Sequence, residues 1–250
     1  GHEVITTPMT FPATTNVIEH VGAKPVLVDI KRDTFNINEN KIEEAITSKT
    51  KVIMPVHLTG RPCEMDKIIQ IADKYNLKII EDAAHAAEAY FKGFKVGSIG
   101  DITCFSFYVT KNIVTGEGGM VTTNNKKLAD KIRIRSLHGI SKDAWKRFSE
   151  EGYSHYETIY PGFKYNMIDI QASLGIHQLN RVNETLVLRE SHWKQYNEAF
   201  HNIPQIITPS EDDRIIHARH LYTIILRINQ LKIDRNQFIS ELKNRNIGSG

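Results

Sequence analysis

The sequence lacks the features that mark membrane, secreted and disulfide-bonded proteins. It holds no apolar run of the roughly eighteen residues that a membrane helix needs, and its first residues lack the pattern of a signal peptide. Its two cysteines, Cys63 and Cys104, do not form a Cys-x-x-Cys pair. These absences predict a cytoplasmic protein with reduced thiols and no membrane segment.

Concentrated charge and metal-binding motifs are also missing. The formal net charge is +3, and the basic residues are scattered instead of gathered into one stripe, so nucleic acid is not an expected partner. Among the eleven histidines, only His217 and His220 have a spacing that could suit a metal. We interpret that pair as part of a polar face or a helix cap, and we predict no metal site.

The sequence does contain a regular alternation of short β-branched runs with amphipathic helical stretches. This alternation is typical of βαβ crossovers, so we predict an α/β fold with a mostly parallel sheet. Hydrophobic residues make up 40% of the 250 positions, enough for one large domain or one domain with part of a second. The predicted strands are Glu3–Thr6, Pro25–Asp29, Lys51–Pro55, Lys78–Glu81, Ile102–Phe107 and Gly119–Thr123. The predicted helices between them are Pro12–Val21, Asn38–Ala45, Glu64–Tyr75 and Lys126–His138, with Asn38 and Asn124 as N-caps.

The second half of the chain has a different organisation. The segment from Gly139 to Tyr165 has no clear periodicity and is too long for an idle connection, so we expect it to cover a site or reach a partner. A long helical region, Ile168–Phe200, follows and leads away from the sheet. A strand at His220–Ile228 and a helix at Asp234–Arg245 then begin a second unit that the sequence does not finish, and both ends of the chain look cut.

Polar residues follow two of the predicted strands at the point where a parallel sheet binds its ligands. Asp82 and His85 come directly after an apolar run, and a carboxylate there can pair with a cationic ring nitrogen such as a pyridinium. A simpler role for Asp82 is to cap the segment that follows. Ser106 and Lys111 follow another strand, five residues apart, and could address the phosphate and the aldehyde of one small ligand. A solvated surface lysine is the competing interpretation.

A third candidate position follows the first strand. Phe11 offers an aromatic ring on which a planar cofactor could stack, although an ordinary core residue would look the same. A glycine cluster at Gly116, Gly118 and Gly119 permits tight turns and close backbone approach beside Lys111. Together these positions indicate one small-ligand site.

These stretches resemble the pyridoxal-phosphate (PLP) dependent sugar aminotransferases of the DegT/DnrJ/StrS family. The resemblance covers nearly the whole chain and includes GHEVITTPMTFPATTN, VGAKPVLVDI, IIEDAAHA, SFYVTKNIVTGEGG and PGFKYNMIDIQASLG. It implies a fold-type I architecture, with a large PLP-binding domain over residues 1–178, a bridging helix over 179–203 and the start of a small C-terminal domain over 204–250.

The resemblance also implies a role for each candidate residue. Lys111 would be the catalytic lysine bonded to the cofactor's aldehyde, and Asp82 would pair with its pyridine nitrogen. Ser106 would hold its phosphate. His85 would lie near its phenolic oxygen, Phe11 would stack on its ring, and Asn166 would reach the phosphate of the neighbouring subunit's cofactor. A homodimer with shared active sites follows from that last role.

The family's activity implies transfer of an amino group from glutamate to a nucleotide-linked 4-keto sugar during cell-surface polysaccharide synthesis. A phosphate-gripping stretch that the family has before the first strand is absent here. Three alternatives stay open or are disfavoured on particular residues. A PLP-dependent sugar dehydratase would have a histidine in place of Lys111, a nicotinamide enzyme would have a Gly-x-Gly-x-x-Gly motif after the first strand, and a non-catalytic binding protein remains possible.

Overall fold

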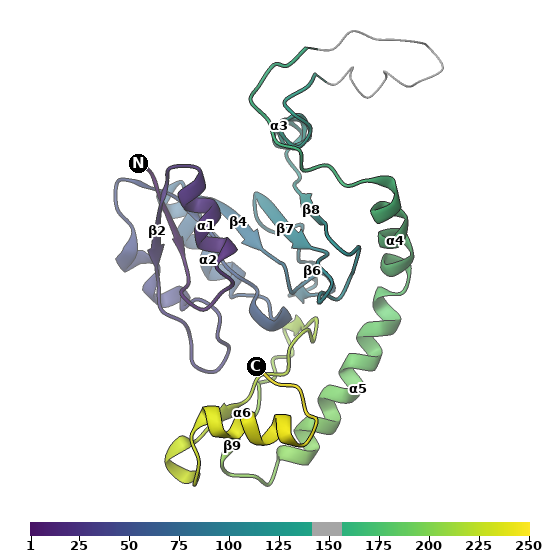
Figure 1. Cartoon of the computed structure of the whole chain (residues 1–250). Coiled ribbons are helices and arrows are strands. Elements are labelled where there is room, and N and C mark those ends of the chain that lie inside the picture. The colour runs from purple at the N-terminus through teal and green to yellow at the C-terminus, as the bar shows by residue number, and fades with distance from the viewer. Residues whose placement is uncertain (142–156) are drawn as a thin grey trace.

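A six-stranded sheet forms the centre of the chain in a computed structural model that describes residues 1–141 and 157–250 (Figure 1). Its strand order is β2-β1-β3-β4-β7-β8, and only β8 runs antiparallel to its neighbour. The α/β fold predicted from the sequence is therefore confirmed. The strands are β1 (Glu3–Thr6), β2 (Lys24–Leu27), β3 (Thr50–Ile53), β4 (Lys78–Asp82), β7 (Ile102–Ser106) and β8 (Gly119–Thr122).

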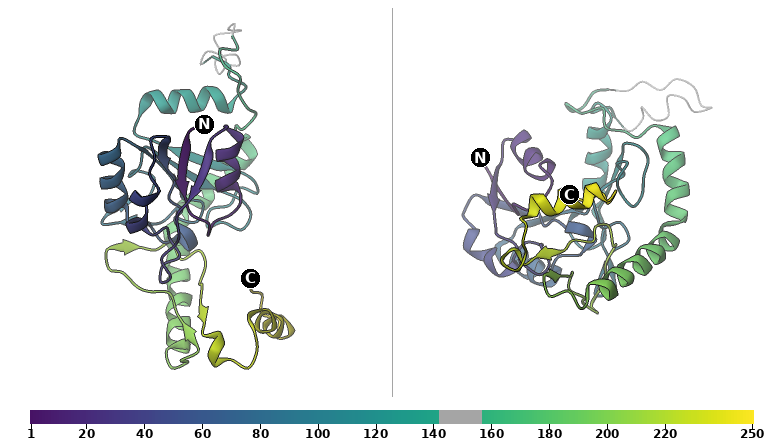
Figure 2. Two further views of the ribbon diagram at one scale, coloured as in Figure 1. Left: turned by 90° about the vertical axis from the view of Figure 1, so that its left-hand side faces the viewer. Right: turned by 60° about the horizontal axis from the view of Figure 1, so that its bottom comes forward.

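Helices α1 (Ala13–His20) and α2 (Met65–Tyr75) cover opposite faces of this sheet (Figure 2). Helix α2 buries Ile68, Ile71 and Ala72, which the 3.6-residue helical period places on one side. That side packs into the main apolar core. The core gathers Ile5, Val28, Ile37, Ile42, Ile53, Cys63, Met65, Leu77, Ile79 and Phe91 with these three residues.

Two of the predicted helices differ from the observed ones. The stretch Asn38–Ala45 forms two short 3₁₀ turns, Glu39–Lys41 and Glu43–Ala45, although Asn38 does cap the first by accepting a hydrogen bond from the Asn40 N–H. Helix α3 (Lys126–Ser136) is capped by Asn125, one residue later than predicted.

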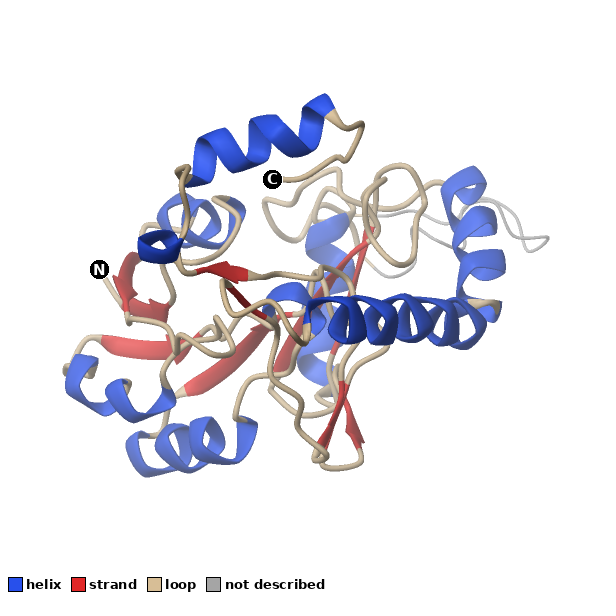
Figure 3. Ribbon diagram, turned by 90° about the horizontal axis from the view of Figure 1, so that it is seen from below, coloured by secondary structure: helices blue, strands red, loops and turns tan. Residues whose placement is uncertain are grey.

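The long helical region after the sheet is split in two. Helix α4 (Asp169–Asn180) and helix α5 (Val182–Phe200) meet at Arg181 and run together down one side of the sheet, as Figure 1 shows, while Figure 3 shows the sheet from below. The predicted covering segment, Gly139–Tyr165, lies largely outside the described residues. Its described ends pair at Ile140 with Thr158.

The C-terminal part adds short strands and one α-helix. β10 (Ile215–Ile216) joins β5 (Tyr90–Phe91) and β6 (Phe94–Lys95) of the first half in one small sheet, and β9 (Ile206–Ile207) pairs with β11 (Ile225–Leu226). The predicted strand His220–Ile228 is thus wrong over most of its length. Helix α6 (Arg235–Asn244) begins with a capping box between Asp234 and Gln237. Within the described part of the chain, no helix has both the length and the apolar character to cross a bilayer.

Candidate active site

Two adjacent strands deliver the main candidate residues to one edge of the sheet. β4 and β7 are hydrogen-bonded neighbours, with Asp82 aligned beside Cys104. Asp82 ends β4, Ser106 ends β7, and Lys111 follows in the turn after β7. The carboxyl ends of parallel strands meet at this edge, which is where open α/β sheets bind ligands.

The Asp82 carboxylate is fixed by two hydrogen bonds. Its Oδ2 accepts from the Thr14 hydroxyl at 2.7 Å, and its Oδ1 accepts from the Ala84 backbone N–H at 3.2 Å. Thr14 lies in the first turn of α1, and its own N–H donates to the Phe11 carbonyl oxygen at 3.1 Å. The loop that carries Phe11 therefore ends beside Asp82. The Phe11 side chain is 75% exposed, so it is not the core residue that was the alternative.

Lys111 is the chemically unusual amine at this edge. Partial burial lowers its pKa from the ordinary lysine value, and the negative charge of Asp82 opposes that shift. Because the charge of Asp82 acts on Lys111, the two groups lie near one another at this edge of the sheet. A lowered pKa increases the fraction of neutral, nucleophilic amine near neutral pH.

The turn after β7 is shaped by backbone hydrogen bonds. The Lys111 N–H donates to the Tyr108 carbonyl oxygen at 2.9 Å, and the Phe107 N–H donates to the Gly118 carbonyl oxygen at 2.8 Å. Gly118 has a φ of +153°, and a side chain there would overlap the Thr115 hydroxyl and meet the end of the Met167 side chain at 2.8 Å. The positive φ, together with the overlap with Thr115, explains why a glycine is needed at that position.

His85 lies beside Lys111 and forms a pair with a second histidine. Its Nδ1 accepts a hydrogen bond from the Thr59 backbone N–H at 3.2 Å, and its ring centroid lies 4.3 Å from that of His220. Burial, together with the nearby His220 and Lys111, lowers the pKa of His85 to about 3. His85 is therefore neutral at any pH where the protein would work.

The remaining two candidates contact their own neighbours. The Ser106 hydroxyl accepts a hydrogen bond from the Tyr108 N–H at 3.3 Å at the end of β7, one turn before Lys111. Asn166 lies just before α4, where its side chain bonds to Lys164 and to the Met167 carbonyl oxygen. Asn166 is not in contact with Asp82, His85 or Lys111 within the described residues.

Two residues of this region, Thr14 and Asn112, were not singled out from the sequence. Thr14 holds Asp82, while Asn112 bonds to Nδ1 of His220 at 2.8 Å. Thr14 gave no signal because its partner is 68 positions away. Asn112 directly follows Lys111, and a polar side chain next to a candidate lysine could have been considered.

The interpretation of His217 and His220 as a polar face or helix cap is wrong, because neither lies on or beside a helix end. His217 is 6% exposed and packs on Trp193, with ring centroids 4.9 Å apart. His220 packs on His85 instead. Among the described residues, no group of three or more His, Cys, Asp or Glu side chains is arranged to hold a metal ion.

Known proteins match this chain over its whole length. It is 59% identical to the uncharacterized protein MJ1066 of Methanocaldococcus jannaschii over 99% of the chain, and 48% identical to the spore coat polysaccharide biosynthesis protein SpsC of Bacillus subtilis over 100% of it. The chain spans 64% of the length of each of these relatives. The fold matches the PMP form of a Streptococcus pneumoniae protein described as a sugar aminotransferase, with a TM-score of 0.91 and 36% identity, over 100% of this chain and 67% of that one. The family model for the DegT/DnrJ/EryC1/StrS aminotransferases matches residues 1–250, and the chain belongs to that family.

Proposed function

We propose that this protein is a PLP-dependent aminotransferase that moves an amino group from glutamate to a nucleotide-linked 4-keto sugar. The observation that carries the proposal is the Lys111 amine, whose pKa is lowered by burial within electrostatic reach of Asp82. Family membership supports the aminotransferase class. The cofactor is supported by the solved relative in its PMP form, PMP being the aminated form of PLP.

The residues at the sheet edge fit that cofactor. Lys111 offers an amine for its aldehyde, and Asp82 offers a carboxylate for its ring nitrogen. Ser106 offers a hydroxyl for its phosphate, one turn before Lys111 along the chain. Phe11 offers an exposed ring on which the planar cofactor could stack. We assign Asn166 to the phosphate of a partner subunit's cofactor.

Pyridoxal phosphate, when bound, supplies an aldehyde that takes up an amine and a ring that accepts the electron pair left by a departing proton. Lys111 in its neutral form would remove the α proton of the amino donor, and its protonated form would later give a proton back. Asp82, held by Thr14, would accept a hydrogen bond from the protonated ring nitrogen. His85, neutral at working pH, would offer its Nε2 N–H to the cofactor's oxygen.

The substrate class rests on the relatives. SpsC of Bacillus subtilis is a spore coat polysaccharide biosynthesis protein, and polysaccharides are built from activated sugars, so we assign a nucleotide-linked keto sugar as the amino acceptor. The free cysteines Cys63 and Cys104 fit a cytoplasmic enzyme. Burial, together with the charges of Asp82 and Glu81, raises the pKa of Cys104 to about 11, so its thiol stays protonated near neutral pH.

A homodimer is part of the proposal. Helix α4 exposes four large apolar side chains, Ile170 (73%), Leu174 (51%), Ile176 (61%) and Leu179 (59%). Such a surface is typical of a protein interface. Sedimentation analysis of wild type and of a Leu174→Glu variant tests this: a wild-type monomer would contradict the dimer, and a variant monomer would locate it at α4.

The direct test of function compares Lys111→Ala with Lys126→Ala, an exposed lysine on α3 as the matched control. Each protein is incubated with PLP, glutamate and a panel of nucleotide keto sugars, and the products are identified by mass. We expect Lys111→Ala to lose both the visible absorbance of lysine-bound cofactor and turnover, whereas Lys126→Ala keeps both. Full turnover in Lys111→Ala refutes the proposal.

The same assay separates the alternatives. A product that has lost a hydroxyl and gained no nitrogen would indicate a dehydratase. Cofactor absorbance that glutamate does not change would indicate a binding protein without transaminase activity. Either result would replace the aminotransferase assignment.

A further inference from the structure

We propose that the adjacent histidines His85 and His220 are locked in opposite tautomers, so that the site presents one fixed hydrogen-bond donor and one fixed acceptor side by side. His220 then acts as a positioning residue and as an acceptor for a donor group of the ligand. The assignment of tautomers is independent of the proposed function, whereas the ligand role of His220 rests on it.

The tautomer of His85 follows from its partner. The Thr59 backbone N–H can only donate a hydrogen bond, so Nδ1 of His85 must accept it with a lone pair. The proton of the neutral ring therefore sits on Nε2. Thr59 itself has a φ of +59°, an unusual conformation for a β-branched residue.

The tautomer of His220 follows from the orientation of Asn112. The Asn112 side-chain Nδ2 faces two groups that can only accept, the Glu88 carboxylate at 2.9 Å and the Ala218 carbonyl oxygen at 3.0 Å. That arrangement fixes which end of the amide is nitrogen. Its Oδ1 therefore faces Nδ1 of His220 at 2.8 Å, and Nδ1 must carry the proton.

The second nitrogen of each ring is available to a ligand. Nε2 of His85 and Nε2 of His220 make no hydrogen bond within residues 1–141 and 157–250. Every fully buried side-chain nitrogen or oxygen in that part of the chain has a partner, so these two atoms must reach solvent or a bound molecule. His85 thus presents an N–H and His220 presents a lone pair.

The charges around the pair favour neutral rings over the working pH range. Lys111 acts on both histidines, and Arg189 also acts on His220. Arg189 is ion-paired with Glu88, and His217 is a further neighbour of His220. Burial is the largest cause, and together with Lys111 and Arg189 it lowers the pKa of His220 to about 4. The donor and the acceptor should therefore not exchange roles between about pH 5 and 8.

An accepting nitrogen suits a ligand group that donates, such as a sugar hydroxyl or the ammonium of an amino donor. Within the proposed reaction, His85 would serve the cofactor and His220 would serve the substrate. Both the sugar hydroxyl and the ammonium can donate a hydrogen bond to His220, and kinetics with each substrate distinguish the two.

The tautomers can be read directly by ¹⁵N NMR of the cofactor-free protein labelled at histidine nitrogens. The His85→Gln and His220→Gln variants assign the two signals. We expect His85 with its proton on Nε2 and His220 with its proton on Nδ1, both unchanged from about pH 5 to 8. The opposite tautomer on either ring, or protonation of either ring near its ordinary pKa, would overturn the lock.

Asn112→Leu tests the cause of the His220 tautomer. We expect His220 to become a mixture of tautomers while His85, still bonded to Thr59, keeps its proton on Nε2. Asn197→Leu is the matched control, because Asn197 bonds to Tyr222 and not to the histidine pair. A His220 signal in Asn112→Leu identical to wild type would contradict this cause. If the variant does not fold, the wild-type measurement still decides the proposal.

The ligand role is tested by His220→Phe, which keeps a ring beside His85 and removes the accepting Nε2. We expect KM to rise about threefold to tenfold for one substrate, the keto sugar if a hydroxyl is bound or glutamate if an ammonium is bound, with a smaller change in kcat. Unchanged KM for both substrates would refute this role. A failure of Lys111 in the functional test leaves the NMR result standing, so the two hypotheses can fail separately.

Discussion

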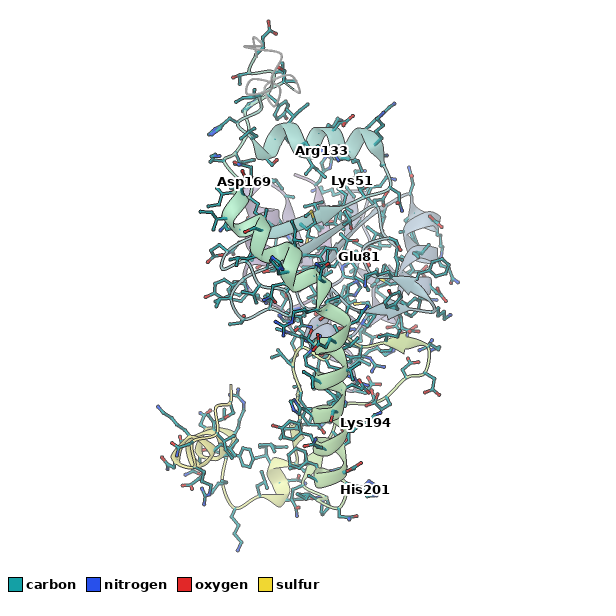
Figure 4. The ribbon with its side chains drawn as sticks, turned by 90° about the vertical axis from the view of Figure 1, so that its right-hand side faces the viewer. Lys51, Glu81, Arg133, Asp169, Lys194 and His201 are labelled. Atoms are coloured by element: carbon teal, nitrogen blue, oxygen red, sulfur yellow. The ribbon has the colours of Figure 1, made fainter. Side chains whose placement is uncertain are left out.

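Glu81 and Asp82 are neighbours on β4, yet their carboxylates have opposite surroundings. Glu81 is fully buried, and its oxygens accept from His57 at 2.8 Å, Thr103 at 2.7 Å and the Gly100 N–H at 2.8 Å. Asp82 is partly exposed and points to the other face, because successive residues of a strand alternate sides. Figure 4 labels Glu81 within the sheet layer, whereas Lys194 on α5 lies below it.

The difference separates stability from chemistry along one strand. Burial alone would raise the pKa of Glu81, but the hydrogen bonds from His57, Thr103 and Gly100 outweigh it and hold that pKa below its ordinary value. No further donor is needed there, so Glu81 is closed to ligands. Asp82 has two bonds and room for a third, from a ring nitrogen.

The largest effect should come from removing the buried carboxylate. Glu81→Leu leaves the donors of His57, Thr103 and Gly100 unsatisfied, and we expect it to lower the free energy of unfolding by about 3–5 kcal/mol. Urea unfolding followed by circular dichroism measures this. Glu81→Gln is the matched variant and should cost less. A Glu81→Leu variant as stable as wild type would remove the structural half of the contrast.

Asp82→Asn should show the converse behaviour. We expect turnover to fall about 10²-fold or more, because an amide cannot hold a proton on the ring nitrogen as a carboxylate does. Its unfolding midpoint should stay close to wild type, since the Asn oxygen can accept from the Ala84 N–H while its amide nitrogen donates to the Thr14 hydroxyl oxygen. Steady-state kinetics and urea unfolding on the same preparation test both halves. A large loss of stability would show that Asp82, like Glu81, has a structural role, and would contradict the contrast.

Acid should lower the stability of the folded protein through protonation of His85. Its pKa is about 3 in the folded protein against an ordinary 6.5, so below pH 6.5 the unfolded chain binds a proton that the folded state does not. Stability from this residue is present above pH 6.5 and is lost as the pH falls toward about 3. Between pH 6.5 and about 3, the urea unfolding midpoint of His85→Gln should therefore fall less than that of the wild type. His2→Gln, at an exposed position, should follow wild type.

The smallest effect should come from Thr14→Val. The substitution keeps the shape of the side chain and removes the hydroxyl that donates to Asp82. We expect a loss of about 1 kcal/mol in stability and a fall in turnover of about tenfold or less. Thr15→Val is a control, because the Thr15 hydroxyl bonds only to the Pro12 carbonyl oxygen. Equal effects of both variants would show that Thr14 does not position Asp82.

The sheet was predictable from sequence because buried parallel strands are short, continuous apolar runs. The predicted Lys78–Glu81 differs from β4 by one residue. The predicted strand at His220–Ile228 failed because the backbone there is used elsewhere: the N–H groups of His220 and Leu221 donate to the Thr59 carbonyl oxygen. A local pattern cannot reveal a partner some 160 positions away.

The candidate site was predictable to the same extent. Asp82, Ser106 and Lys111 follow strands, and the rule for strand ends finds them without a structure. His85 was found with Asp82, but its contact with His220 was not, since that contact depends on tertiary packing. Thr14 was missed for the same reason. Sequence thus finds the groups that react and misses those that orient them.

The turn at Thr59 and Gly60 connects the first half of the chain to residues 218–221 of the second half. Gly60 has a φ of +97°, and a side chain there would lie 2.9 Å from the His85 carbonyl oxygen and 3.0 Å from Ala218. The Ala218 N–H donates to the Gly60 carbonyl oxygen at 2.9 Å. Residues 218–221 therefore supply backbone donors to this turn and the second histidine of the pair, His220, neither of which comes from the first half of the chain. Two fragments cleaved near Ser210 should each be incomplete, and they should regain the histidine pair only when mixed.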